Sequence, residues 1–200
     1  MLFRNLAVPA ALFVHGAYAT LTPDQVVTNI NIVTTASQGI LNAVTPITKN
    51  SSPGDVVTAG QTATTNFNTI IQNLGGDVSA MDGTVFTAAQ AVPVCAALTD
   101  FVNVHQAVLS TVIGKHGFLA QFGVAQPLAA VLRTLEGAID AFAFGAIAML
   151  PSCANQVTQQ QAGLDTSVAS AISQYEEICL PSPLYPTVMP VCVGIPPISI

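Results

Sequence analysis

The stretch that decides the fold is residues 112–151, VIGKHGFLAQFGVAQPLAAVLRTLEGAIDAFAFGAIAMLP. It ends one helix, turns through a segment rich in glycine and phenylalanine, and opens a long apolar helix. The large residues of that long helix recur at a spacing of four and three, which places them in one stripe on one face. They are Leu128, Leu132, Leu135, Ile139, Phe142, Ala146 and Met149. Because so apolar a helix needs packing partners on most sides, we expect other helices to surround it.

Four other segments show the same helical spacing. We expect these helices over about residues 23–47 and 53–81, from a start between 84 and 93 to 114, and over about 152–178. Short turns join them and no segment alternates as a strand does. The predicted fold is therefore all-α, an antiparallel five-helix bundle. The tail that follows has six prolines in residues 180–200, so we expect an extended strap there.

Local signals mark several helix boundaries. Thr22 and Gln25 form a capping-box pattern around a proline at the first helical position, and Ser52 precedes a proline in the same way. The pair Gly75-Gly76 is expected to break or bend the second helix, with a short continuation to Met81.

The first nineteen residues have the pattern of a signal peptide. Arg4 supplies the basic region, residues 6–14 are apolar, and Ala17-Tyr18-Ala19 is a small-x-small cleavage site. The predicted organisation is a signal peptide over residues 1–19, a helical domain over 20–178 and a tail over 179–200. The protein is then secreted and extracellular.

Composition excludes several classes of partner. Cleavage after residue 19 leaves three basic and ten acidic side chains, a formal charge of −7, which opposes binding to nucleic acid and to anionic membranes. Only 7% of residues are charged and 51% are apolar. The best membrane-span candidate, residues 124–150, carries three charges and two glycines, so no transmembrane segment is expected. We expect a monomer.

Four cysteines in a secreted chain predict two disulfides. In an antiparallel bundle, Cys95 at the start of the third helix and Cys153 before the fifth lie at the same end, so they are expected to pair. Cys179 would then pair with Cys192 and clip the tail into a loop. No CxxC pair is present and the histidines are scattered, so no metal site or other cofactor is expected.

Three polar residues interrupt the apolar stripes: Ser37, His105 and Gln161. A buried polar group without a partner costs a few kcal/mol. Either these groups satisfy one another or reach the surface, or they form a polar patch in an apolar pocket, suited to a ligand head group. Two interpretations are also open for Lys115: it is a solvated lysine in a turn, or it is a cation at the mouth of a cavity.

An ordered set of positions resembles a known family. The positions are Ile113, Gly114, Lys115, Phe118, Gly123, Val124, Leu132, Leu135, Ala138, Asp140, Ile147, Leu150 and Pro151. Together with the signal peptide and the five helical segments they resemble the fungal hydrophobic surface-binding protein family, which also contains cell wall galactomannoproteins, over about residues 23–175. The resemblance implies a secreted helical bundle with an internal apolar cavity, in which some members bind fatty acids while others coat hydrophobic surfaces.

The chain departs from that family at two places. His116-Gly117 stands where many members have Lys-Pro, which changes little in the expectation. The tail is proline-rich and contains cysteines, in place of a long Ser/Thr-rich stalk. This second departure favours a freely secreted protein over one associated with the cell wall.

The leading hypothesis is a non-enzymatic carrier of long-chain fatty acids or similar lipids. The expected ligand-binding residues are Phe67, Ile71, Phe101, His105, Val108, Leu132, Leu135, Ile139 and Phe142, with Ser37 and Gln161 as polar members. The alternative is a surface-active protein whose bundle opens on a hydrophobic solid or a cell wall surface. No nucleophile motif accompanies the histidines, so no enzyme is expected. Asn50 lies in the single glycosylation sequon.

Overall fold

A computed structural model describes residues 21–194, so the predicted signal peptide lies outside the described residues. Within this part of the chain there are six helices and one two-stranded sheet, where the sequence predicted five helices and an extended tail. The elements are α1 (Pro23–Val44), α2 (Pro53–Ala80), α3 (Ala88–Gly114), α4 (His116–Gln121), α5 (Ala125–Met149), α6 (Ala154–Tyr175), β1 (Ile178–Leu180) and β2 (Val191–Val193).

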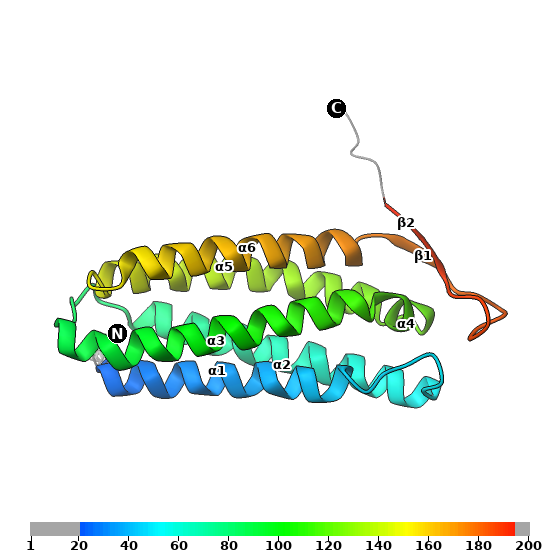
Figure 1. Cartoon of the computed structure of the whole chain (residues 1–200), viewed down its shortest axis with the longest axis horizontal. Coiled ribbons are helices and arrows are strands. Elements are labelled where there is room, and N and C mark those ends of the chain that lie inside the picture. Colours follow the sequence, from blue (N-terminus) through cyan, green and yellow to red (C-terminus); the bar gives the residue numbers. More distant parts are fainter. Residues whose placement is uncertain (1–20, 195–200) are drawn as a thin grey trace, which may run out of the picture.

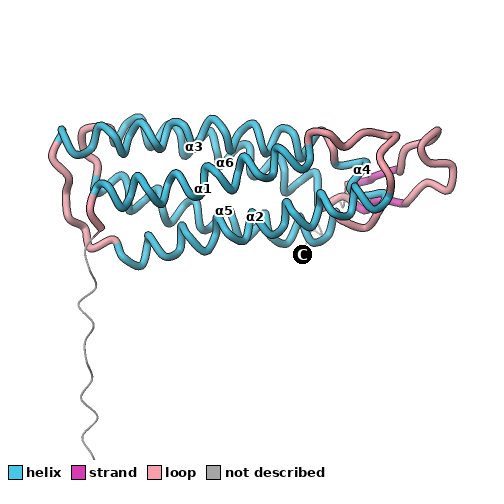
Figure 2. Tube along the Cα trace, turned by 90° about the horizontal axis from the view of Figure 1, so that it is seen from below, coloured by secondary structure: helices cyan, strands magenta, loops and turns pink. Residues whose placement is uncertain are grey.

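The five long helices run side by side and form a closed ring (Figures 1 and 2). α1 packs between α2 and α3, and α5 packs between α2 and α6. The contact of α6 with α3 closes the ring. Each long helix therefore turns one face toward a shared interior, and the apolar stripes seen in the sequence fill that interior.

The helix starts follow the signals in the sequence. Thr22 and Gln25 form the expected capping box of α1, and Ser52 caps α2 in a box with Asp55. α3 begins in the same way, with Thr87 as its cap. These side chains satisfy backbone N–H groups that have no partner within the helix, which fixes where each helix begins.

Two predicted features of the helices are wrong. The predicted break at Gly75-Gly76 is absent, because the residues on either side, Leu74 and Asp77, are buried against the bundle and hold the helical path. α2 does continue to Ala80, close to the expected end at Met81. The turn after α3 contains the additional short helix α4. It begins directly after Lys115, whose φ of −102° and ψ of 1° end α3 and redirect the chain.

Mean hydropathy identifies α3, at 1.3, as the described helix that is long and apolar enough to cross a membrane. The candidate named from the sequence was instead residues 124–150. In the structure α3 packs against α1 and α6 and contributes ten buried residues to the bundle. Its apolar character is thus accounted for by the ring.

The tail forms a hairpin where an extended strap was expected. β1 and β2 pair antiparallel, with Ile178 opposite Val193 and Leu180 opposite Val191. The hairpin projects from the end of the bundle near α4 (Figure 1).

Both expected disulfides are present, Cys95–Cys153 and Cys179–Cys192. The first joins the start of α3 to the residue before α6, as the antiparallel order requires. The second links the paired strands of the hairpin.

Candidate functional site

A small apolar cavity lies between α3, α5 and α6 and reaches α2. Its lining residues are Leu74, Leu98, Phe101, Val102, Ile139, Phe142, Ala143, Val157, Gln160, Gln161 and Leu164. The volume of this cavity is about 30 Å³. This is room for roughly one or two water molecules, far less than a long acyl chain needs. The ring is therefore closed here around a narrow gap.

The structure brings four of the expected ligand-binding residues to this cavity: Phe101, Ile139, Phe142 and Gln161. They come from α3, α5 and α6, which enclose the cavity on three sides. Phe101 lies at the middle of α3, and the other three lie between the middle of their helices and the end of the bundle that holds the Cys95–Cys153 disulfide.

The other expected residues are in the bundle but do not line the cavity. Four of them are apolar and fully buried in the packed core, namely Phe67, Val108, Leu132 and Leu135. Ile71 is only partly buried, because Ile70 and Leu74 occupy the inward positions of α2. Phe67, Ile70 and Leu74 share one helical spacing, and Ile71 lies off it, so Ile71 was the wrong choice on this helix.

Ser37 and His105 meet each other in the core. Both are completely buried, and 2.9 Å separates Ser37 Oγ from His105 Nδ1. The His105 ring lies between Phe67 and Phe101, with ring centroids 6.0 and 5.2 Å away. Two of the three polar residues that interrupt the stripes thus satisfy each other across α1 and α3.

The hydrogen-bond network assigns the tautomer of His105. Ser37 Oγ donates its hydrogen to the Val33 carbonyl at 2.9 Å, so the hydrogen of the Ser37–His105 bond comes from Nδ1. Nε2 is then a bare acceptor, and it has no hydrogen-bond partner among the described residues. Burial lowers the pKa of His105 to about 4, so the imidazole is neutral near pH 7.

Glutamine amides border the cavity on both edges of α6. Toward α3, Gln160 Nε2 donates to Thr99 Oγ1 at 2.9 Å, and Gln156 Nε2 donates to the same oxygen at 2.7 Å. Toward α5, Gln161 Nε2 donates to Asp140 Oδ1 at 3.2 Å. We call the Thr99–Gln156–Gln160 group the amide clasp. It joins α3 to α6 beside the cavity, which Gln160 also lines.

The two edges differ in charge. On the α5–α6 edge, burial together with Asp140 and Glu136 raises the pKa of Asp165, which shows that this edge is acidic. The amide clasp contains no charged side chain. A negatively charged ligand group is therefore tolerated better at the α3–α6 edge.

Lys115 does not lie at the mouth of this cavity. Its Nζ donates to the Ile47 carbonyl at 2.6 Å and lies 5.9 Å from the Phe118 ring centroid. Along α3 it is roughly 20 Å from Val102, the nearest cavity residue of that helix. Its observed contacts tie the loop before α2 to the end of α3.

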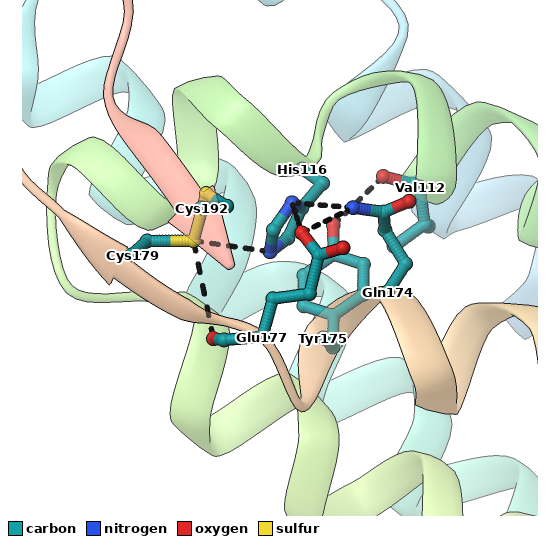
Figure 3. Close-up of polar contacts among 7 residues, drawn as sticks. All are labelled: Val112, His116, Gln174, Tyr175, Glu177, Cys179 and Cys192. Atoms are coloured by element: carbon teal, nitrogen blue, oxygen red, sulfur yellow. Dashed lines mark hydrogen bonds and ion pairs between the residues drawn. A yellow bond between two sulfur atoms is a disulfide. The ribbon is translucent and has the colours of Figure 1, made fainter. Parts of the chain in front are cut away.

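A second polar group, which the sequence did not indicate, surrounds His116 (Figure 3). The His116 ring is buried, with Nδ1 3.2 Å from Gln174 Nε2 and 3.9 Å from Glu177 Oε2. Its Nε2 lies 3.6 Å from Cys179 Sγ. Nearby, Tyr175 donates to the Val112 carbonyl at 2.7 Å. Helical spacing carried no signal for this group, because its members come from α3, α4, α6 and the start of the tail, which are far apart in the sequence.

The His116 group is not a metal site as it stands. His116, Cys179 and Cys192 place one potential donor atom each within 4.8 Å of the others. The sulfur atoms of Cys179 and Cys192 form a disulfide, so neither offers the thiolate that a metal would need. Its contacts instead hold the hairpin against α4 and α6.

No protein-family model matches the chain. No characterised protein matches its sequence either.

Solved structures do share its fold, and they are helical domains determined with fatty acids bound. Afmp4p in complex with palmitic acid has a TM-score of 0.67 at 13% identity, over 76% of this chain and 99% of that one. Ligand-binding domain 2 of the Penicillium marneffei MP1 protein, in complex with arachidonic acids, has a TM-score of 0.59 at 15% identity, over 74% of this chain and 90% of that one. Domain 1 of that protein, also complexed with arachidonic acids, gives 0.55 and 18%, with coverage of 76% and 95%. At these identities the likeness establishes the fold.

Proposed function

We propose that this protein is a secreted, non-enzymatic carrier that binds a long-chain fatty acid between α3, α5 and α6. The observation that carries the proposal is an apolar cavity in the interior of a ring of helices whose fold matches that of domains solved with palmitic and arachidonic acids. The fatty acid enters by separating helices that are closed in the described state.

The helix that moves is α6. It contributes five buried residues, Val157, Leu164, Val168, Ala171 and Tyr175, whereas α5 contributes eleven. Its contacts to α3 over the cavity include the amide clasp, whose hydrogen bonds can be exchanged for bonds to water. The Cys95–Cys153 disulfide holds one end of α6, and the Tyr175 hydrogen bond holds the other. The part of α6 from Gln160 to Val168 can therefore bow outward while its ends stay in place.

Apolar burial supplies the free energy of binding. Each methylene removed from water contributes roughly 0.8 kcal/mol, so a long chain offsets the cost of association and of separating the helices. The same term makes affinity increase with chain length.

The carboxylate lies at the α3–α6 edge. The amide groups of Gln156 and Gln160 can donate to it there, and the clasp itself carries no charge. His105 is unsuited to this role, because its free Nε2 is an acceptor and would meet the lone pairs of a carboxylate. Ser37 and His105 instead support the wall that Phe101 forms.

Native mass spectrometry with a panel of fatty acids tests the proposal. We expect one long-chain fatty acid to bind, with affinity rising with chain length. Ala143→Leu fills the gap, since Ala143 lines the cavity, and should reduce binding about tenfold or more while thermal stability stays near that of the parent protein. Ala141→Leu is the matched control, on an exposed position of the same helix.

Two results would count against the carrier. One is the absence of any fatty-acid complex across the panel. The other is depletion of the protein by hydrophobic beads with no competition from soluble fatty acid, which would favour the surface-active alternative. Secretion is tested separately, by sequencing the N-terminus of the protein recovered from culture medium.

A further inference from the structure

The C-terminal hairpin, residues 178–193, presents an apolar face to solvent; we call it the arm. Its side chains at Ile178, Leu180, Val191 and Val193 are 53–67% exposed. The register pairs them across the two strands, so all four lie on one face, opposite the face that carries the Cys179–Cys192 disulfide. Residues 178–200 contain no Asp, Glu, Lys, Arg or His.

The apolar character continues into the turn of the arm. Leu184, Val188 and Met189 are exposed there as well. Figure 1 shows the turn projecting beyond the end of the bundle near α4. A projecting group of large apolar side chains without a charged residue among them is rare on a protein that remains exposed to water.

The arm is held in place by the bundle. Gln121 binds the backbone of Ser182 twice, accepting from its N–H at 2.8 Å and donating to its carbonyl at 3.0 Å. Phe122 packs edge-to-face on Tyr185 with centroids 5.4 Å apart. At the base, His116 contacts the disulfide (Figure 3). These contacts fix the disulfide face inward and the apolar face outward.

We propose that the arm docks this protein on an electrically neutral lipid surface, by inserting its apolar face and turn among the lipids. The inference rests on the proposed carrier function only in that docking would bring the carrier to its source of fatty acid. A lipid surface fits a projecting, uncharged shape because fluid lipid can surround it, as it surrounds the apolar face of an interfacial segment.

The charge of the protein favours a neutral lipid surface over a second copy of the chain as the partner of the arm. The whole chain has a formal charge of −6, so two copies repel as they approach, whereas a neutral lipid surface does not repel either of them. The cavity lies toward the opposite end of the bundle, roughly 20 Å along α3. Docking therefore leaves the amide clasp uncovered, and docking and loading are separate steps.

Flotation of the full protein with phosphatidylcholine vesicles tests the proposal. We expect the protein to float with the vesicles at low and high salt alike, because apolar insertion needs no ion pairs. The double variant Leu180→Ser/Val191→Ser should bind the vesicles at least about tenfold more weakly than the parent protein. Both positions are exposed, so the variant should keep the circular dichroism spectrum and thermal stability of the parent protein.

Phe144→Ser is the matched control. Phe144 is the most exposed large apolar residue of α5 and lies toward the other end of the bundle, so its loss should leave flotation unchanged. Doping the vesicles with phosphatidylglycerol should weaken binding, because the chain is acidic.

Palmitic acid binding, measured in the same samples without vesicles, separates this proposal from the carrier function. Equal palmitate affinity in the double variant and the parent protein, with flotation lost, supports the arm as a docking element. Flotation through the arm without palmitate binding would also support docking while removing the carrier function. Equal flotation of the parent protein and the double variant, or no flotation of either, would overturn the proposal. So would a dimer in sedimentation analysis that depends on Leu180 and Val191.

Discussion

Ionisation of the buried His105 makes the free energy of unfolding depend on pH. Its folded-state pKa is about 4, lowered by burial, while an exposed histidine titrates near 6.5. Between these values the unfolded chain binds a proton that the folded chain does not. The stability that neutral His105 provides is therefore complete above about pH 6.5 and is lost as pH falls toward 4.

We predict that the free energy of unfolding decreases by up to about 3 kcal/mol between pH 7 and pH 4 because of this residue. Urea denaturation at a series of pH values measures it. The His105→Leu variant should lack this part of the slope, whatever its overall stability. His116 and the buried Asp77 are present in both proteins, so their own pH effects cancel in the comparison. Parallel pH profiles for the two proteins would show that His105 takes no part.

The other residues that define the candidate site differ in how visible they were in the sequence. Phe101, Ile139 and Phe142 occupy stripe positions, and helical spacing alone brings them inward. His116 and Gln121 lie in a glycine-rich turn, and their partners are 58 and 61 positions away in the chain. No local rule joins such residues, because the tail must first fold back on α4.

For the helices, the sequence predicted the features that depend on neighbouring residues, such as the helix starts. It failed for features that depend on packing between helices. The capping residues Thr22 and Ser52 set the starts of α1 and α2 through contacts three residues away. Gly75-Gly76 was misread because the propensity cost of two glycines, about 1 kcal/mol each, is smaller than the gain from burying the helix around them. Ile70, and not Ile71, lies inward, because Phe67, Ile70 and Leu74 share the helical spacing of the buried face of α2.

The amide clasp predicts how fast the ring opens. Thr99→Val removes the oxygen that accepts from Gln156 and Gln160 and keeps the shape of the side chain. We expect uptake of a fluorescent fatty acid to become several-fold faster in stopped-flow measurements, with a change of no more than about 1 kcal/mol in the free energy of unfolding.

Thr158→Val is the control for the clasp. Thr158 is exposed on α6 and bonds only to the Ala154 carbonyl of its own helix, as Thr99 also bonds to the Cys95 carbonyl of α3. Its loss should leave uptake unchanged. The same uptake rate in the Thr99 variant as in the parent protein would mean that the α3–α6 edge is not the entrance.

The whole molecule is a ring of five long helices with different chemistry at its two ends. The cavity and the Cys95–Cys153 disulfide lie toward one end, and the arm with its own disulfide lies at the other. Antiparallel order, deduced from the sequence, was enough to pair the cysteines correctly. The size of the gap inside the ring was not accessible in the same way, because it depends on how every side chain packs.

The central claim, that a fatty acid lies between α3, α5 and α6, is tested most directly by methyl NMR during titration with palmitic acid. We expect the largest shifts at the methyl groups of Leu98, Ile139 and Leu164, which line the cavity. Ile30 and Ile40 of α1, buried outside it, should shift little and serve as internal references. Shifts confined to the arm, at Leu180 and Val191, or no shifts at palmitate concentrations that saturate binding, would contradict the claim.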